Sequence, residues 1–161
     1  MSVDINFRRR LWSVDTAGPV LRDLAAGADI IFAGPAEAAL VTGAGPGMTS
    51  ERLARLLATS TKADAVIKDG ARGCTALIGG ELHDVPAIAA DVIDPVGAGD
   101  AFVAGHLSEL LRGEPPARCL ATAIAVGAFT VTVPGDCEGL PSREDLDLFL
   151  HQNEDGDDVR R

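Results

Sequence analysis

Cysteine is scarce in this chain of 161 residues, and its pattern favours neither a disulfide framework nor a zinc site. The cysteines Cys74, Cys119 and Cys137 are odd in number and include no C-x-x-C pair. A disulfide framework needs an even set of cysteines in an oxidising compartment, and a structural zinc site needs closely paired ligands. The sequence therefore predicts a protein of the reducing cytoplasm without a zinc centre.

Positive charge and long apolar runs are also lacking. The formal net charge is −10, the pI is near 4.6, and the only basic cluster is Arg8-Arg9-Arg10. Such a chain offers no basic footprint for nucleic acid or an anionic bilayer. No apolar run reaches the roughly 18 residues that a membrane span needs, and the first residues lack the apolar core of a signal peptide. We expect a soluble protein with neither nucleic acid nor membrane as a partner.

Apolar segments and turn residues alternate in a way that is typical of an α/β fold with a mostly parallel sheet. A chain of this length, 47% apolar, suits one domain. Gly79-Gly80 predicts a tight hairpin turn between two strands, and Asn153 to Arg161 is acidic and expected to be a disordered tail. The order predicts a three-layer α/β/α architecture. Strands are expected at 2–6, 28–33, 63–68, 74–79, 81–85 and 91–93, and helices at 16–26, 35–43, 49–58, 97–112, 117–130 and 142–150.

The stretch Gly97-Ala98-Gly99-Asp100 combines flexible backbone with an acid at the start of an expected helix. Glycines let the backbone come close to a ligand, and the first amides of a helix have no intrahelical acceptor, so together they form an anion cradle. Ligands of open α/β sheets gather at such strand-to-helix turns. A second interpretation stays open, in which the glycines only make the turn and Asp100 only complements the helix dipole.

Two other phosphate-binding motifs fail on this chain. A P-loop would need a lysine that the segment 43–49 lacks, and a dinucleotide fingerprint would need glycine where Phe102 stands. These failures disfavour a nicotinamide-dependent oxidoreductase. An anion cradle beside an acid suits phosphoryl transfer to a hydroxyl, with the cradle stabilising the transferred group and Asp100 accepting the proton.

At these residues the sequence resembles the ribokinase-like (PfkB-type) sugar kinases. Asp94-Pro95-Val96-Gly97-Ala98-Gly99-Asp100 is similar to the family motif D-T-x-G-A-G-D, with Pro95 in place of threonine. Three further segments fall in the family's order, and the first is closest to the 2-keto-3-deoxygluconate kinase and fructokinase branches. They are 4–12 (D-x-N-x-R…LW), 29–37 (the strand before N-x-x-E, with Gly34 for Asn) and 66–73 (K-x-G-x-x-G).

This resemblance implies a Rossmann-like ribokinase-type fold over residues 1–152 and a role for each matching residue. Asp100 would be the catalytic base, and Gly97, Ala98 and Gly99 would form the anion hole. The implied cofactors are ATP and Mg²⁺, with K⁺ as a further candidate. Glu37 would hold Mg²⁺ through water, and Arg8 with Asn6 would face the phosphoryl group or sugar acid. Lys68, Gly70 and Gly73 would lie along the nucleotide, with Ala121 to Ala125 near its base. Asp94 with Val133–Gly135 would bind a monovalent cation.

Several of these residues also have simpler explanations. Glu37 could be a solvated helix acid, Arg8 to Arg10 a surface cluster, and Gly70 with Gly73 a requirement of the loop alone. The alanine-rich stretch 121–128 permits close helix packing whatever binds beside it. The histidines, isolated in sequence, are expected to be structural or exposed.

The resemblance covers only the family's C-terminal half, and the half that supplies most sugar-binding residues has no counterpart here. Two hypotheses follow. The chain is a sugar kinase, most similar to 2-keto-3-deoxygluconate kinases, which acts as a whole or with a complementary N-terminal half or a second copy. Alternatively, it is a nucleotide-binding fragment without turnover. An uncovered sheet edge would favour such pairing.

Overall fold

The computed structural model describes the backbone of residues 1–135 and 138–158. The chain divides into two compact units, Met1–Val85 and the part from Pro86 onward. The first unit holds the whole described sheet, and the second is helical. No helix in the described part of the chain is both long and apolar enough to cross a membrane.

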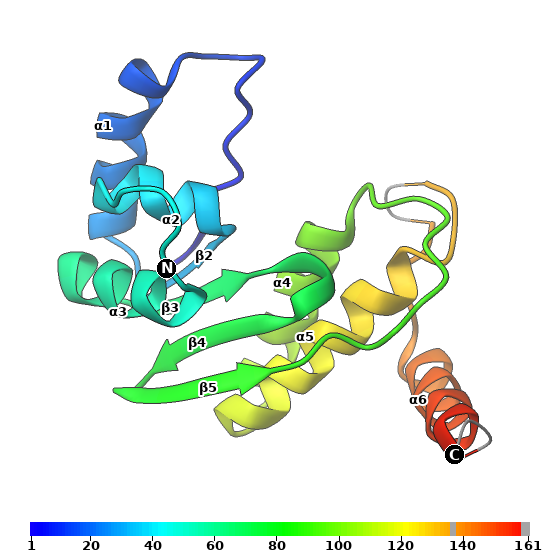
Figure 1. Ribbon diagram of the computed structural model, residues 1–161. Coiled ribbons are helices and arrows are strands. Elements are labelled where there is room, and N and C mark those ends of the chain that lie inside the picture. The colour runs from blue at the N-terminus through cyan, green and yellow to red at the C-terminus, as the bar shows by residue number, and fades with distance from the viewer. Residues whose placement is uncertain (136–137, 159–161) are drawn as a thin grey trace. The chain divides into compact units, whose positions relative to one another are not determined.

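The sheet of the first unit has the strand order β1-β2-β3-β4-β5 (Figure 1). Neighbouring strands are parallel from β1 to β3, and antiparallel from β3 to β5. The predicted hairpin is confirmed, with Gly79 at φ 57° and Gly80 at φ 85°, which suits a two-residue turn with positive φ at both positions. The strand bounds are Ser2–Asp4 for β1, Ile30–Ala33 for β2, Asp64–Lys68 for β3, Cys74–Ile78 for β4 and Glu81–Val85 for β5.

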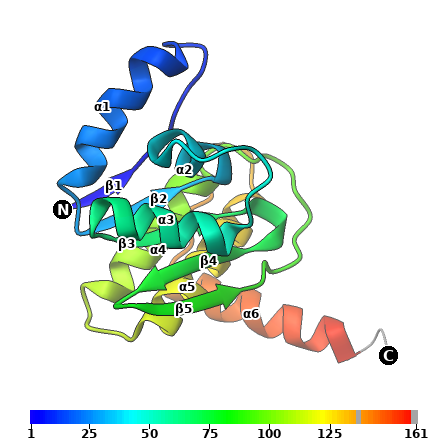
Figure 2. The ribbon, with the colours of Figure 1, turned by 60° about the vertical axis from the view of Figure 1, so that its left-hand side comes forward.

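Three helices of the first unit bury their apolar stripes against the sheet. They are α1 (Val14–Ala26), α2 (Pro35–Thr42) and α3 (Ser50–Thr61), seen beside the strands in Figure 2. Alternate strand residues such as Ile31 and Ile67 join Leu21 and Leu57 of the helices in one buried cluster. All of β2 is buried, as expected for the inner strand of a parallel sheet.

The helix boundaries follow the expected start and stop residues. Ser13 Oγ accepts a hydrogen bond from the Thr16 N–H at 3.2 Å, and Thr49 Oγ1 accepts one from the Arg52 N–H at 3.3 Å. Pro35 opens α2, and Gly43 ends it in the left-handed region at φ 72°. The local sequence predicted Pro35 and Gly43 as the ends of α2, but it missed the Ser13 cap, so α1 begins at Val14 rather than at the predicted Thr16.

The second unit contains α4 (Ala98–Leu110), α5 (Pro116–Thr130) and α6 (Arg143–Asp158). The strand predicted at 91–93 is wrong: the N–H groups of Ile93 and Asp94 both donate to the carbonyl of Val131, at 2.8 and 3.1 Å. The segment is thus hydrogen-bonded to Val131 at the C-terminal end of α5 and pairs with no described strand. A short apolar run does not distinguish these two outcomes.

Helix α6 runs further than the sequence predicts. It was expected to end near Leu150, but it continues to Asp158, into the acidic segment expected to be disordered, and residues 159–161 lie outside the described part. A ring contact between Phe129 and Phe149, with centroids 5.5 Å apart, joins α5 to α6. Arg143 and Arg112 both pair with the buried carboxylate of Glu109, which further secures the start of α6.

Helices α4 and α5 pack closely at Gly105. A Cβ at this position would lie 3.0 Å from Val126 Cγ2 and 3.1 Å from Ala123 Cα, closer than side chains normally pack. The contact therefore requires a residue without a side chain, although glycine is a poor helix former.

We predict that Gly105→Ala lowers the free energy of unfolding by about 1–3 kcal/mol, because overpacking outweighs the gain in helix propensity. Urea denaturation measures the change. Ala104→Ser, at an exposed position of the same helix, is the control and should stay within about 0.5 kcal/mol of wild type. A stabilised Gly105→Ala protein would contradict the close approach.

Candidate active site

The turn before α4 has the geometry of an anion cradle. Gly97 is the N-cap in the left-handed conformation, φ 77°. The first helical hydrogen bond runs from the Ala101 N–H to the Gly97 carbonyl at 2.8 Å. The N–H groups of Gly99 and Asp100 therefore lack an acceptor one turn earlier among the described residues. Asp100 itself is exposed and makes no hydrogen bond or ion pair with the described residues, so its carboxylate is open to a ligand.

The side chain of Asp94 links the turn before α4 to the segment that follows α5. Its Oδ1 accepts the Val96 N–H at 3.0 Å, and its Oδ2 accepts the Gly135 N–H at 3.2 Å. These two backbone bonds, Val96 first, hold the pKa of the Asp94 carboxyl below its usual range. The two segments expected to form a monovalent-cation site, Asp94 and Val133–Gly135, thus lie together, while the cation itself stays a prediction.

In the first unit, Glu37 bridges the chain segments that leave β1 and β2. Its Oε1 accepts the Phe7 N–H at 2.8 Å, and its Oε2 accepts the Gly34 N–H at 2.7 Å. Glu37 is therefore a half-buried capping residue and not the solvated helix acid of the simpler explanation. No group of three or more His, Cys, Asp or Glu side chains in the described part could hold a metal. Magnesium bound mainly by phosphates and water fits this arrangement, because carboxylate oxygens keep lone pairs for metal-bound water.

Lys68, at the end of β3, is paired with Asp4 at the end of β1. The Nζ–Oδ2 distance is 2.6 Å, and only 18% of the lysine side chain and 15% of the aspartate side chain are exposed. The family resemblance implied a nucleotide contact for Lys68 and no role for Asp4. No local signal could have found this pair, since 63 residues separate the two in the chain and only the parallel register brings them together.

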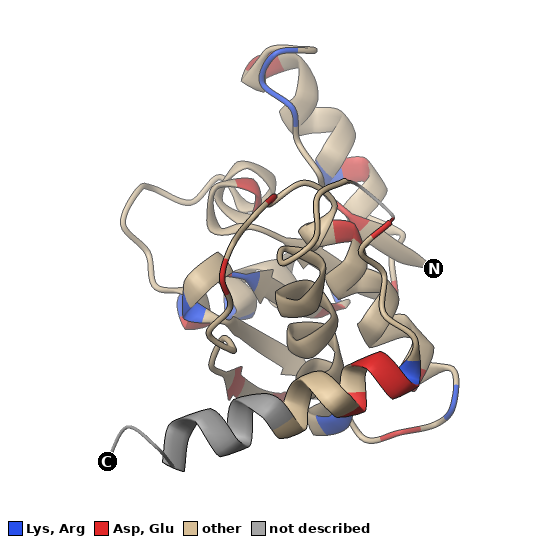
Figure 3. Cartoon of the chain, turned by 90° about the vertical axis from the view of Figure 1, so that its right-hand side faces the viewer, with Lys and Arg blue, Asp and Glu red and all other residues tan. Residues whose placement is uncertain are grey.

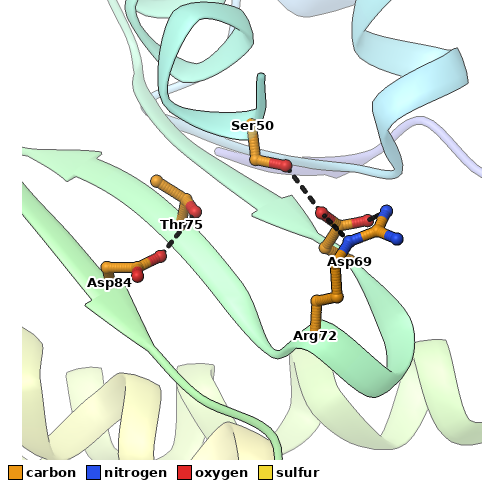
Figure 4. Close-up of polar contacts among 5 residues, drawn as sticks. All are labelled: Ser50, Asp69, Arg72, Thr75 and Asp84. Carbon is orange, nitrogen blue, oxygen red and sulfur yellow. Dashed lines mark hydrogen bonds and ion pairs between the residues drawn. The ribbon is translucent and has the colours of Figure 1, made fainter. Parts of the chain in front are cut away.

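The loop with Gly70 and Gly73 is built around Asp69. Asp69 Oδ2 accepts hydrogen bonds from Ser50 Oγ at 2.7 Å and Arg72 Nε at 3.0 Å, and Oδ1 pairs with the second Arg72 nitrogen (Figure 4). The Arg72 hydrogen bond is the main cause that lowers the pKa of Asp69. Gly70 at φ 57° and Gly73 at φ 100° make the turn, so the loop requires both glycines whatever binds beside it. Sequence reasoning missed the Asp69 cluster.

The hairpin that follows this loop has a polar cross-strand pair of its own. Thr75 Oγ1 donates to Asp84 Oδ1 at 2.8 Å, between β4 and β5 (Figure 4). The two residues are direct partners in the strand register. The pair therefore supports the register set by the Gly79-Gly80 turn.

The remaining predicted site residues differ in their access to a ligand. Asn6, at φ 41°, and Arg8 are exposed in the segment that follows β1, and Arg8 makes no ion pair with the described residues. On α5, Ala121 is exposed while Ala125 is 1% exposed. Ala125 is thus part of the helix packing and is not available for a nucleotide base in this structure.

Comparison with known proteins agrees with this arrangement. Residues 1–143 match the family described as pfkB family carbohydrate kinase. The chain is 37% identical over 153 residues to 2-dehydro-3-deoxygluconokinase of Bacillus subtilis, covering 93% of this chain and 46% of that protein. It is 33% identical over 136 residues to 2-dehydro-3-deoxygalactonokinase of Haloferax volcanii, covering 83% of this chain and 42% of that protein. The chain thus spans about half the length of these curated relatives.

Solved structures share the fold. A putative ribokinase II from E. coli, solved in complex with ATP and Mg²⁺, matches with a TM-score of 0.82 and 25% identity, over 94% of this chain and 48% of that one. Aminoimidazole riboside kinase from Salmonella enterica, solved with aminoimidazole riboside and an ATP analogue, matches with a TM-score of 0.80 and 29% identity, over 92% and 51%. The predicted α/β ribokinase-type fold is confirmed.

We predict that the Asp69 cluster contributes stability that depends on pH. A lowered folded-state pKa stabilises the protein above the unfolded value of about 3.9, and this contribution is lost as the pH falls through the lower folded value. Asp69→Asn should therefore lose less unfolding free energy than wild type between about pH 6 and pH 3. Urea denaturation at each pH tests this, with the exposed Asp91→Asn as control. Equal pH dependence in wild type and Asp69→Asn would contradict the prediction.

Proposed function

Because the chain belongs to the pfkB family of carbohydrate kinases, we propose that it serves the transfer of the γ-phosphoryl group of ATP to a sugar hydroxyl. For the acceptor we propose a sugar acid similar to 2-keto-3-deoxygluconate, supported by the kinase of B. subtilis among its relatives. One observation carries the proposal: an exposed carboxylate, Asp100, stands beside free amides at the start of α4. For location we propose the cytoplasm, consistent with the free thiols of Cys74 and Cys119.

In the proposed mechanism, Asp100 orients the acceptor hydroxyl and takes its proton as the oxygen bonds to the γ-phosphorus. The bond from that phosphorus to the bridging oxygen breaks, and ADP leaves with the electron pair. The Gly97–Gly99 backbone stabilises the charge on the transferred group, an effect commonly worth about 2.7–4 kcal/mol for each donor. A carboxylate near a helix N-terminus is a weak base, which suffices because the proton leaves late in a loose transition state.

The first unit would contribute the nucleotide and phosphate contacts. We assign Gly70, Gly73 and the stem of Lys68 to the nucleotide, and Arg8 with Asn6 to the phosphoryl group or sugar acid. From the second unit, we assign the exposed Ala121 of α5 to the surroundings of the base. Magnesium, when bound with ATP, would neutralise charge on the phosphates. Glu37 would hold it through water, with its two backbone hydrogen bonds keeping the carboxylate in place. A monovalent cation near Asp94 and Val133–Gly135 is part of the same proposal.

A second function is favoured by the length of the chain. It spans 46% and 42% of the two curated relatives named above. The chain would then be a nucleotide-binding part that turns over sugar only with a complementary N-terminal half or a second copy.

The deciding experiment titrates the purified chain with MgATP by calorimetry, alongside a coupled assay of ADP release with 2-keto-3-deoxygluconate, fructose and ribose. ATP binding with sugar-dependent ADP release would establish the kinase and its acceptor class. Binding without release would favour the partner-dependent part, and the absence of both would reject the two functions.

We predict that Asp100→Asn lowers sugar-dependent ADP release by about 10²–10⁴-fold, because the proton acceptor is lost. ATP affinity should stay within a few-fold, since the amide keeps the size of the side chain. The matched control is Asp91→Asn, an exposed acid before the turn, which should leave turnover unchanged. A large loss of ATP binding in Asp100→Asn would instead mean that Asp100 is structural.

A further prediction concerns the backbone of the cradle. Gly99→Val places a branched side chain where phosphate oxygens would approach the N–H groups, so we expect at least about a tenfold loss of ATP affinity by calorimetry. Thermal unfolding of the same variant checks that the fold is kept. Unchanged ATP affinity in a folded Gly99→Val protein would reject the cradle.

A further inference from the structure

The first unit contains an open cavity whose lining includes no residue of the proposed catalytic turn. Its volume is about 520 Å³, and every lining residue lies between Phe7 and Ala44. Its lining residues come from α1, α2, the segment that leads into α1 and the residues just after α2. Phe7, Val14, Pro19 and Leu40 give it apolar walls. The volume falls in the range of small-molecule sites, about 300–1,000 Å³.

The charged groups of this cavity are Arg9, Arg22 and Asp15. Neither arginine forms an ion pair or a side-chain hydrogen bond with a described residue, whereas Arg55, Arg72, Arg112 and Arg143 all have carboxylate partners. The basic run before α1 appears as the blue segment at the upper end of Figure 3. Other described arginines, such as Arg8 and Arg10, also form no such pair, so what distinguishes Arg9 and Arg22 is that both line one cavity in a chain of net charge −10.

Gly18 forms part of the cavity lining, and the side chain of Arg22 lies next to it. A Cβ at this buried position would lie 3.4 Å from both a terminal nitrogen of Arg22 and Leu40 Cδ1. The guanidinium group of Arg22 therefore lies across the glycine, next to the apolar wall of α2. A cationic group beside apolar surface matches a ligand with a charged head and an apolar body.

We propose that this cavity binds a small organic carboxylate, with the carboxylate on Arg9 and Arg22 and the apolar body against Phe7, Pro19 and Leu40. Planar guanidinium groups bind carboxylates through paired N–H donors. With Asp15 counted, the lining carries one net positive charge, which suits a singly charged head better than a phosphate monoester. None of the lining residues has a role in the proposed phosphoryl transfer.

The test is a titration of the ¹⁵N-labelled full chain with sodium benzoate, followed by NMR, without nucleotide. We expect saturable shifts of the Gly18 and Gly43 amide signals, with a Kd of about 1 mM or tighter. Benzyl alcohol, which has the ring without the charge, should give no saturable shift. Phenyl phosphate should bind more weakly than benzoate, and tighter binding of phenyl phosphate would overturn the choice of a carboxylate.

Variants separate this site from general charge effects. Arg9→Gln and Arg22→Gln should each weaken benzoate at least about tenfold. Arg10→Gln removes a charge from the same exposed run but does not line the cavity, so it should leave the Kd unchanged. Gly18→Ala suits a helix and so keeps the fold, yet it fills part of the cavity and should also weaken benzoate.

Two results would overturn the proposal. One is the absence of saturable shifts, and the other is an equal loss of binding in Arg10→Gln and in the two cavity variants. Because no step of the titration involves ATP or turnover, its failure is independent of the proposed kinase function.

Discussion

In the first unit, the carboxylate of Glu37 fixes how the chain leaves the carboxyl ends of strands β1 and β2. It accepts the N–H of Phe7, in the segment that leaves β1, and the N–H of Gly34, where the chain leaves β2. Each half-buried donor would otherwise lack a partner, at a cost of about 1–3 kcal/mol. A Cβ at Gly34 would lie 3.5 Å from Glu37 Oε2, an ordinary contact distance, so this hydrogen bond does not depend on the lack of a side chain there. The glycine that departs from the family motif is thus compatible with a tightly held glutamate.

The carboxylates of this chain differ in whether they accept hydrogen bonds from the described residues. Glu37, Asp69 and Asp94 each accept hydrogen bonds from groups that fix a turn or a strand exit. Asp100 makes no such bond with the described residues and is exposed. An acidic residue that accepts a proton from a substrate needs a free carboxylate on a backbone that is held in place. The Asp94 bonds hold the turn before α4, and the packing of α4 on α5 at Gly105 supports the helix that follows it.

Turns and helix starts set by particular residues were predictable from the sequence. Contacts that depend on strand register, or on a helix end far along the chain, were not. Gly79-Gly80 sets its turn because few other residues adopt positive φ, and Pro35 marks a helix start because it lacks the N–H that a helix interior needs. The run at 91–93 was mistaken for a strand, since apolar residues alone do not reveal that the Val131 carbonyl takes their N–H groups. The pair of Lys68 with Asp4 depends on two strands on either side of β2. The turn at 97–100 was placed correctly at the start of α4, because glycines and an acid are typical of that local conformation, while its chemical role stays a proposal.

The two ends of the proposed reaction differ in how well they are preorganised. At the catalytic turn, both the backbone and the helix behind it are held by specific contacts. The proposed substrate residues Arg8 and Asn6 are exposed, and Arg8 makes no ion pair with the described residues. A site that selects among sugars needs side chains locked by supporting contacts. Among the residues of the proposed reaction, those of the turn before α4 are therefore held by more supporting contacts than Arg8 is.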